Sequence, residues 1–97
     1  MIVWKVEFKP SADREFRKLP RDAQDKIRAS LRHLATTGLG DVTAMKGNQA
    51  GKFRLRVGDY RLIFRRETRD DASEGKQEIL FVILVLHVGN RRDVYKH

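Results

Sequence analysis

The fold of this chain is decided by the stretch Lys52-Phe53-Arg54-Leu55-Arg56-Val57-Gly58-Asp59-Tyr60-Arg61-Leu62-Ile63-Phe64. Successive side chains of a β-strand point to opposite faces. The first half therefore predicts a strand with an apolar face (Phe53, Leu55, Val57) and a basic face (Lys52, Arg54, Arg56). Gly58-Asp59 is typical of a tight turn, and the second half repeats the alternation less regularly. The stretch predicts a β-hairpin with one buried face, and folding alone gives no reason for its other face to carry only cations.

The residues before the hairpin predict one strand and two helices. Residues 2–8 are β-branched and aromatic, as in a strand, and Pro10 ends that strand. Ser11 is suited to cap a short helix that Pro20 stops. A second helix starts at Pro20 or Arg21 and ends at Gly38. Its apolar stripe consists of Ala23, Ile27, Leu31, Leu34 and Ala35.

The remaining segments predict loops and one more strand. Residues 36–51 show little periodicity and are interpreted as a loop with a short strand near Met45. Residues 67–78 contain five acidic and two basic residues, which favours a solvated hairpin loop. Residues 79–86 are apolar on both faces, as expected of a central strand, and Gly89-Asn90 should end it.

These elements predict an α+β fold in a single domain spanning residues 1–97. The order is β-α-α-β-β-β, and sequential hairpins give a mostly antiparallel sheet. The helical hairpin should pack on one face of that sheet, since two layers bury both apolar stripes. The direction of the first strand is left open by the pattern.

Composition narrows the possible partners. The chain has a net charge of +8 and a pI of about 10.3, which favours a polyanion: nucleic acid, an acidic protein or an anionic membrane. It has no cysteine, and its three histidines lack the spacing of metal ligands, so neither a metal site nor a cofactor is expected. The longest apolar run, residues 79–88, has ten residues, whereas a membrane helix needs about 20. We expect a cytoplasmic protein without a membrane partner.

Cations are concentrated in and around the hairpin. Between residues 46 and 66 the chain has seven cations and one anion, Asp59. One interpretation is a solvated surface that keeps a small basic domain soluble, although solubility calls for mixed signs. The alternative is phosphate binding, with arginine forks and lysine point charges as ligands.

Catalysis is a sharper hypothesis. Cleavage of RNA by its own 2′-hydroxyl requires removal of that proton, neutralisation of charge on phosphorus and protonation of the leaving oxygen. Tyr95 follows Arg91 and Arg92 in a basic tail. Nearby cations favour the phenolate and so lower a tyrosine pKa, which would make Tyr95 a possible base. The alternative is a packing tyrosine at a chain end.

Three segments together resemble the RelE/ParE toxin superfamily of type II toxin–antitoxin systems. They are Lys46-Gly47, the stretch from Gly51 to Phe64, and Val88-Gly89-Asn90-Arg91-Arg92-Asp93-Val94-Tyr95. The predicted order of elements agrees with that superfamily over the whole chain. The resemblance to the RelE branch implies an endoribonuclease that cuts messenger RNA on the ribosome and thereby inhibits translation.

The resemblance also implies roles for individual residues. Lys52 and Arg54 would contact the scissile phosphate, with Arg54 standing where RelE has a second lysine. Arg61 would stabilise the charge of the transition state, Arg91 would protonate the leaving group and Tyr95 would be the general base. The interval from Arg91 to Tyr95 is shorter than in RelE itself. The remaining cations nearby would bind RNA: Lys46, Arg56, Arg92 and Lys96.

The ParE branch provides an alternative function. Its members share the fold but inhibit DNA gyrase without a nuclease site, and they usually lack this set of Lys, Arg and terminal Tyr. Either branch implies a RelB-like antitoxin whose acidic or amphipathic segment masks the basic face, in a complex that is oligomeric. A third possibility, from another class, is a nucleic-acid-binding module without toxicity.

Overall fold

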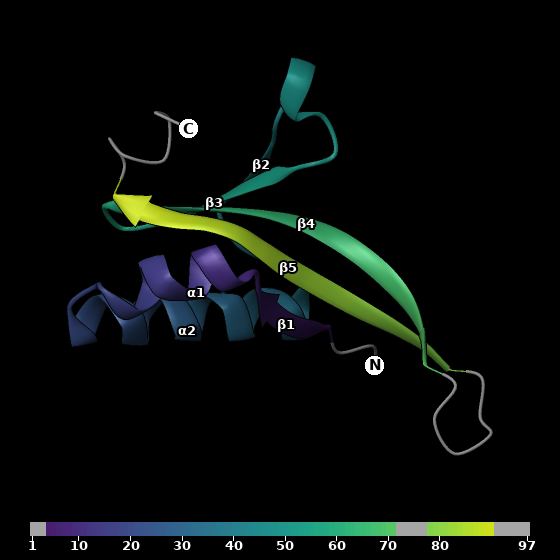
Figure 1. Ribbon diagram of the computed structural model, residues 1–97, viewed down its shortest axis with the longest axis horizontal. Coiled ribbons are helices and arrows are strands. Elements are labelled where there is room, and N and C mark those ends of the chain that lie inside the picture. The colour runs from purple at the N-terminus through teal and green to yellow at the C-terminus, as the bar shows by residue number, and fades with distance from the viewer. Residues whose placement is uncertain (1–3, 72–77, 91–97) are drawn as a thin grey trace.

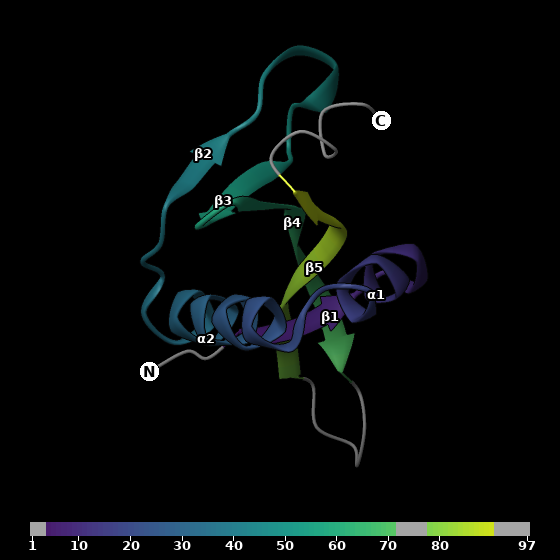
Figure 2. The ribbon, with the colours of Figure 1, turned by 90° about the vertical axis from the view of Figure 1, so that its left-hand side faces the viewer.

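The structure is a computed structural model that describes residues 4–71 and 78–90, and its sheet contains five strands in the order β1-β5-β4-β3-β2. The elements follow the chain as β1 (Lys5–Phe8), α1 (Pro10–Arg17), α2 (Arg21–Thr37), β2 (Val42–Ala44), a 3₁₀ turn η1 (Gly47–Gln49), β3 (Phe53–Val57), β4 (Tyr60–Asp71) and β5 (Glu78–Asn90). Both helices lie on one side of the sheet, and the loop around η1, between β2 and β3, extends away from the helices (Figures 1 and 2). The predicted α+β class is confirmed, and β2 is the short strand expected near Met45.

The sheet is antiparallel except at one edge. β1 pairs with β5 in parallel, whereas the β2–β3, β3–β4 and β4–β5 pairs are antiparallel. The parallel pair requires a crossover, which the two helices provide. This arrangement brings the N-terminal strand beside the last strand of the sheet.

Proline and glycine set the helix boundaries. Lys9 is the N-cap of α1 and Pro10 is its first helical residue, so the prediction of Ser11 as the cap is wrong. Proline is favoured at the first helical position because its fixed φ suits the helix and its missing N–H has no partner there. Gly38 ends α2 in the left-handed conformation at φ 76°, and its N–H donates to Leu34 O. The predicted α2 stripe is confirmed, since all five of its residues are buried.

The hairpin of β3 and β4 supplies the centre of the sheet. Leu55 pairs with Leu62, and Phe53 pairs with Phe64, with the two aromatic rings stacked 5.5 Å apart. Leu55, Leu62 and Phe64 are at most 1% exposed and pack in the same cluster as the helix stripe. The predicted apolar face of the hairpin is therefore confirmed.

β4 and β5 extend further than predicted. β4 continues through residues 67–71 and pairs with the start of β5, from Glu67↔Val82 to Asp71↔Glu78. At the other end β5 continues through Gly89 and Asn90, which pair with Arg61 and Tyr60. The predicted loop over 67–78 and the predicted stop at Gly89 are thus wrong at these positions. A paired partner strand satisfies the backbone hydrogen bonds of both segments, and this outweighs their weak strand propensity.

A network of charged side chains accompanies this extension. Arg69 binds both Glu7 and Glu67, at 2.7 and 2.9 Å, and Arg65 binds Glu67 at 2.7 Å. The hydrogen bonds from Arg69 lower the pKa of Glu7 and of Glu67. The network ties β1 to β4 across β5, so the polar residues of β4 contribute to strand pairing.

Stability is therefore expected to fall in acid, and Arg69→Met should weaken this pH dependence. Glu7 and Glu67 have pKa values in the folded state that are lower than the ordinary value of 4.5. Their contribution to folding stability is therefore complete above pH 4.5 and is lost as the pH falls through the lowered pKa values. Urea unfolding at neutral pH and at about pH 3 measures the loss. Arg14→Met, on the exposed surface of α1, is the control. If the stability of Arg69→Met depended on pH as that of the wild type does, the ion pairs of Arg69 with Glu7 and Glu67 would not be the cause of the acid sensitivity.

No helix in residues 4–71 and 78–90 combines the length and the apolar character that crossing a membrane requires.

Candidate active site on the open face of the sheet

The face of the sheet opposite the helices, called the open face below, has a small apolar centre. Ile63 and Leu86 are 4% and 7% exposed and pack with Met45 and Leu84, in a cluster separate from the helix-covered core. An irregularity in the β4–β5 register at Ile63 and Phe64 brings Leu86 to this face. The open face is therefore not purely basic, because apolar side chains fill its middle.

Three arginines surround this apolar centre on neighbouring strands. Arg54 pairs with Ile63, and Arg56 pairs with Arg61, so all three arginines share the open face. Arg54 is partly exposed and Arg56 is exposed. Like charges directly opposite each other on two strands are destabilising. The Arg56–Arg61 pair thus costs stability in the isolated chain, as expected where an anion is bound between them.

Arg61 has the most unusual environment of the three. Arg61 is only 9% exposed. Its Nε is buried and has no hydrogen-bond partner in the part of the chain that the structure describes. Within the same described part, no ion pair involves Arg61 or the facing Arg56. Burial of an unpaired cation is costly, and an anionic ligand would offset that cost.

Lys52 immediately precedes β3 and has the same strand parity as Arg54. Its ammonium donates to Gln49 Oε1 at 2.9 Å, and both residues are partly buried. Lys46 is exposed just before η1, in the loop that extends away from the helices (Figure 2). The structure thus brings together Lys52, Arg54, Arg56 and Arg61, with Lys46 on the adjoining segment. Gln49 was not among the sequence candidates, and its only signal was its spacing of three residues from Lys52.

Two other cations of the hairpin do not join this group. Arg66 has the parity of Phe64 and lies toward the helix side, with its guanidinium 4.8 Å from the Phe53 ring centroid and 6.0 Å from that of Trp4. Arg65 is on the open face but binds Glu67. Neither arginine therefore belongs to the group around Arg61, and Arg65 is an exposed surface charge.

Four predicted site residues follow β5 in the sequence. Arg91, Arg92, Tyr95 and Lys96 lie outside the described residues. At the end of the described part of β5, Gly89 pairs with Arg61 and Asn90 pairs with Tyr60. The last described residues of β5 therefore lie beside the buried arginine.

A carboxylate of α1 contacts β5 from the helix side of the sheet. Glu15, on α1, accepts a hydrogen bond from Val88 N at 3.3 Å, and its Oε1 lies 3.9 Å from His87 Nδ1. β1 pairs β5 only as far as Val85, so Glu15 satisfies a backbone donor that no strand reaches. His87 pairs with Ile63, whereas Val85 pairs with the next residue, Phe64. The register irregularity lies between these two pairs. Among the described residues, no cluster of three His, Asp or Glu side chains could hold a metal ion.

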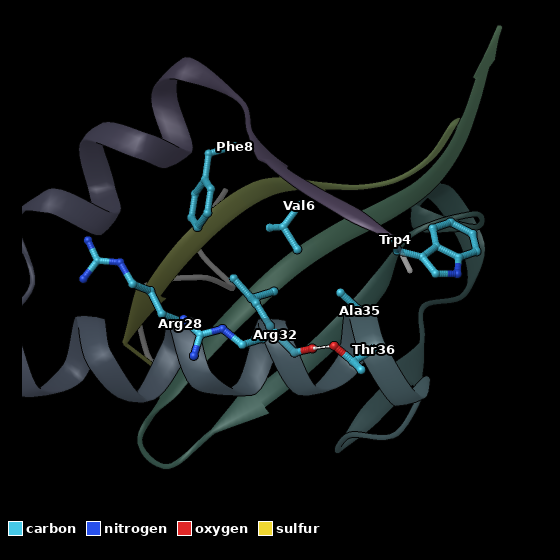
Figure 3. Close-up of a pocket in the computed structure, with 8 residues that line it drawn as sticks. Trp4, Val6, Phe8, Arg28, Arg32, Ala35 and Thr36 are labelled. Atoms are coloured by element: carbon cyan, nitrogen blue, oxygen red, sulfur yellow. Dashed lines mark hydrogen bonds between the residues drawn. The ribbon is translucent and has the colours of Figure 1, made fainter. Parts of the chain in front are cut away.

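A separate apolar pocket lies on the helix side, between β1 and α2. Its volume is about 350 Å³. Trp4, Val6 and Phe8 line it from the β1 segment, and Arg28 and Arg32 border it from α2 (Figure 3). Because β1 is an edge strand, this pocket is at the border of the sheet. It is apolar with a cationic rim, in contrast to the polar group on the open face.

Similarity to known proteins is found by comparing structures and not by comparing sequences. No protein-family model matches the chain, and no curated protein sequence matches it significantly. Among solved structures, the toxin–antitoxin complex RelBE2 from Mycobacterium tuberculosis matches with a TM-score of 0.70 and 24% identity, over 93% of this chain and 100% of that chain.

Two archaeal complexes give the same result. The RelB–RelE antitoxin–toxin complex from Methanococcus jannaschii matches with a TM-score of 0.63 and 16% identity, over 93% of this chain and 95% of that chain. The RelE–RelB complex from Pyrococcus horikoshii matches with a TM-score of 0.63 and 19% identity, over 94% of this chain and 98% of that chain. The chain therefore has the RelE toxin fold, as the sequence resemblance implied.

Proposed function

We propose that this chain is the toxin of a type II toxin–antitoxin system and that it cleaves messenger RNA on the ribosome. The observation that carries the proposal is Arg61, a buried arginine that faces Arg56 and has no partner for its Nε among the described residues. A phosphodiester would supply the missing negative charge. The RelE toxin fold supports the class of protein, and the open-face cations support the class of substrate.

The proposed chemistry is attack of a 2′-hydroxyl on the adjacent phosphorus. The attacking oxygen forms a bond to phosphorus and the 5′-oxygen of the next nucleotide leaves, giving a 2′,3′-cyclic phosphate and a 5′-hydroxyl end. Negative charge increases on the phosphoryl oxygens in the transition state. Lys52, Arg54 and Arg61 are proposed to stabilise it, because donors fixed in advance toward a developing charge lower the barrier.

Two proton transfers complete the reaction. Tyr95 is proposed to remove the 2′-hydroxyl proton, and Arg91 to donate a proton to the leaving oxygen. Both assignments come from the sequence resemblance. They are supported by the course of β5, which ends beside Arg61. Arg56, Lys46, Arg92 and Lys96 are proposed to bind the RNA backbone.

We further propose a RelB-like antitoxin as the protein partner. The three similar structures are complexes of a toxin with an antitoxin. The pocket between β1 and α2 offers apolar walls for the side chains of a partner segment, and Arg28 and Arg32 offer cations for its acidic residues. This pocket would allow the partner to anchor away from the open face while another segment covers the cations.

Induced expression of the wild-type chain in bacteria is expected to arrest growth and to produce new messenger RNA ends at codon boundaries. Mapping of RNA ends measures the cleavage, and an inhibitor of translation initiation should abolish it if the ribosome is required. Lys18→Ala, on the exposed end of α1, is the control and should remain toxic. Arrest without new RNA ends but with DNA breaks would instead indicate a gyrase-directed toxin. Unaffected growth would contradict both toxin functions.

A further inference from the structure

The segment that leads into β3 is a closed loop that fixes Lys52 against Gln49. Met45 N donates to Lys52 O at 3.0 Å, Lys52 N donates to Gln49 O at 3.1 Å and Gln49 N donates to Lys46 O at 3.3 Å. Gly47 and Gly51, at φ 65° and 89°, allow the chain to turn at both ends of η1. The backbone therefore holds the two side chains on one structural unit.

The side chains of Lys52 and Gln49 form a donor-rich group. Lys52 Nζ donates to Gln49 Oε1 at 2.9 Å. An ammonium has no acceptor, so the amide must present its oxygen to Lys52 and direct its NH₂ away from it. No other residue in the described ranges binds that amide. The pair thus offers the remaining ammonium protons and the amide protons from one structural unit, and Lys52 is two residues before Arg54 in the chain.

A group of donors without a free acceptor suits an oxyanion. A phosphate oxygen accepts several hydrogen bonds, and bonds that involve an ion are the stronger ones. A carboxylate at position 49 would also hold the ammonium, but it would neutralise its charge and remove the amide donors. The neutral amide fixes Lys52 without reducing its attraction for an anion.

We propose that Gln49 is a positioning residue for Lys52 and that its NH₂ group donates to the same RNA phosphate that Lys52 contacts. This inference rests on the proposed function, since it concerns the same site. The inference adds a neutral residue, Gln49, to a site otherwise made of lysines and arginines. It also gives η1 the role of presenting Lys52 to the substrate.

The test compares two substitutions at position 49 with one at position 48. Gln49→Ala removes both the acceptor and the donors, whereas Gln49→Glu keeps an acceptor for Lys52 and adds a negative charge. Asn48→Asp adds the same charge at the neighbouring exposed residue and is the matched control. The readout is the rate of messenger RNA cleavage in a purified translation system, with kcat and KM determined separately. Melting temperatures verify that each variant is folded.

We expect Gln49→Ala to lower kcat/KM about tenfold, the equivalent of one hydrogen bond to a charged group. Gln49→Glu should lower it about a hundredfold, since repulsion of the phosphate adds to the lost donors. Asn48→Asp should stay within about twofold, because its charge is screened by solvent. If the bond only stabilised the loop, Gln49→Glu would be the milder change, since it retains the contact with Lys52. A rate for Gln49→Glu equal to or above that of Gln49→Ala would overturn the proposal.

A second measurement separates this proposal from the proposed function. Inorganic phosphate is titrated against the wild type and Gln49→Glu, and the Lys52 side-chain resonances are followed by NMR. A shift in the wild type that is lost in Gln49→Glu supports the anion site even if the wild type cleaves no RNA. Absence of cleavage would then refute only the nuclease function. Absence of a shift in the wild type, or an equal shift in the variant, would overturn the role of Gln49.

Discussion

Replacing Arg61 with methionine is expected to abolish messenger RNA cleavage and to make the protein more stable. Arg61 is buried, its Nε has no partner in the described part of the chain, and Arg56 faces it across the β3–β4 ladder. Methionine fills a similar volume without the charge, and an uncharged side chain suits the adjoining Ile63. We therefore expect unfolding to become less favourable by about 1 kcal/mol, which raises the melting temperature of a domain of this size by roughly 4–8 °C.

The loss of activity has an independent cause. A donor directed at the charge that forms in the transition state contributes about 3–4 kcal/mol, so cleavage should fall at least about a hundredfold. Calorimetry and RNA-end mapping on the same protein measure the two effects. Opposite signs for stability and activity are expected only of a residue retained for its ligand.

Arg65→Met is the matched control for Arg61→Met. Arg65 is on the same strand and face but is exposed and bound to Glu67. Its replacement removes the same charge, and it should leave the cleavage rate unchanged and give no gain in stability. A lower melting temperature for Arg61→Met would show that Arg61 is satisfied within the fold, and retained cleavage would show that another residue stabilises the charge.

Local pattern predicts the centre of this fold well. Alternation in the hairpin identifies Leu55 and Leu62 as core residues, and the helical spacing of the α2 stripe does the same for Ile27. In both elements the apolar residues recur on the face that is buried, so the local pattern and the tertiary environment agree. Proline and glycine mark the helix boundaries for the same reason, although the N-cap of α1 is Lys9, two residues before the predicted Ser11.

Long-range pairing accounts for what the sequence could not predict. Residues 67–71 are polar and resemble a loop, yet they form a strand because β5 provides a full ladder and Arg69 reaches Glu7, 62 residues away in the chain. The apolar centre of the open face depends on the register irregularity at Ile63, which brings Leu86 to that side. Pattern alone assigns a residue to a face but does not reveal such a shift.

In the candidate site, too, some features follow from the local sequence pattern and others depend on long-range pairing. Strand parity places Arg54, Arg56 and Arg61 on one face, as the structure has them. Parity does not reveal that Arg61 is buried and Arg56 exposed, since both are arginines in adjacent strands. Burial depends on the neighbouring strand, where Gly89 lies beside Arg61. The contact of Gln49 with Lys52 likewise depends on the closed loop around η1.

Substitution of Tyr95 by phenylalanine should cause the other large loss of activity. If the phenolic oxygen removes the 2′-hydroxyl proton, its deletion is expected to slow cleavage by about 10²–10⁴-fold, the usual contribution of a general base. The ring is retained, so a tyrosine that serves only for packing would tolerate the change. Initial rates of cleavage in a purified translation system measure the effect.

The chain provides a matched control, because it has two tyrosines. Tyr60 pairs with Val57 and Asn90 and packs against the helix-covered core, so Tyr60→Phe should keep the cleavage rate. A base that acts as phenolate also predicts that the wild-type rate rises with pH until Tyr95 is ionised, and that Tyr95→Phe loses this rise. Cations stabilise the phenolate, so replacing an open-face arginine such as Arg56 by methionine should displace the rise to higher pH. A Tyr95→Phe variant with the wild-type rate and pH profile would refute the assignment and leave the open-face cations as the whole of the active site.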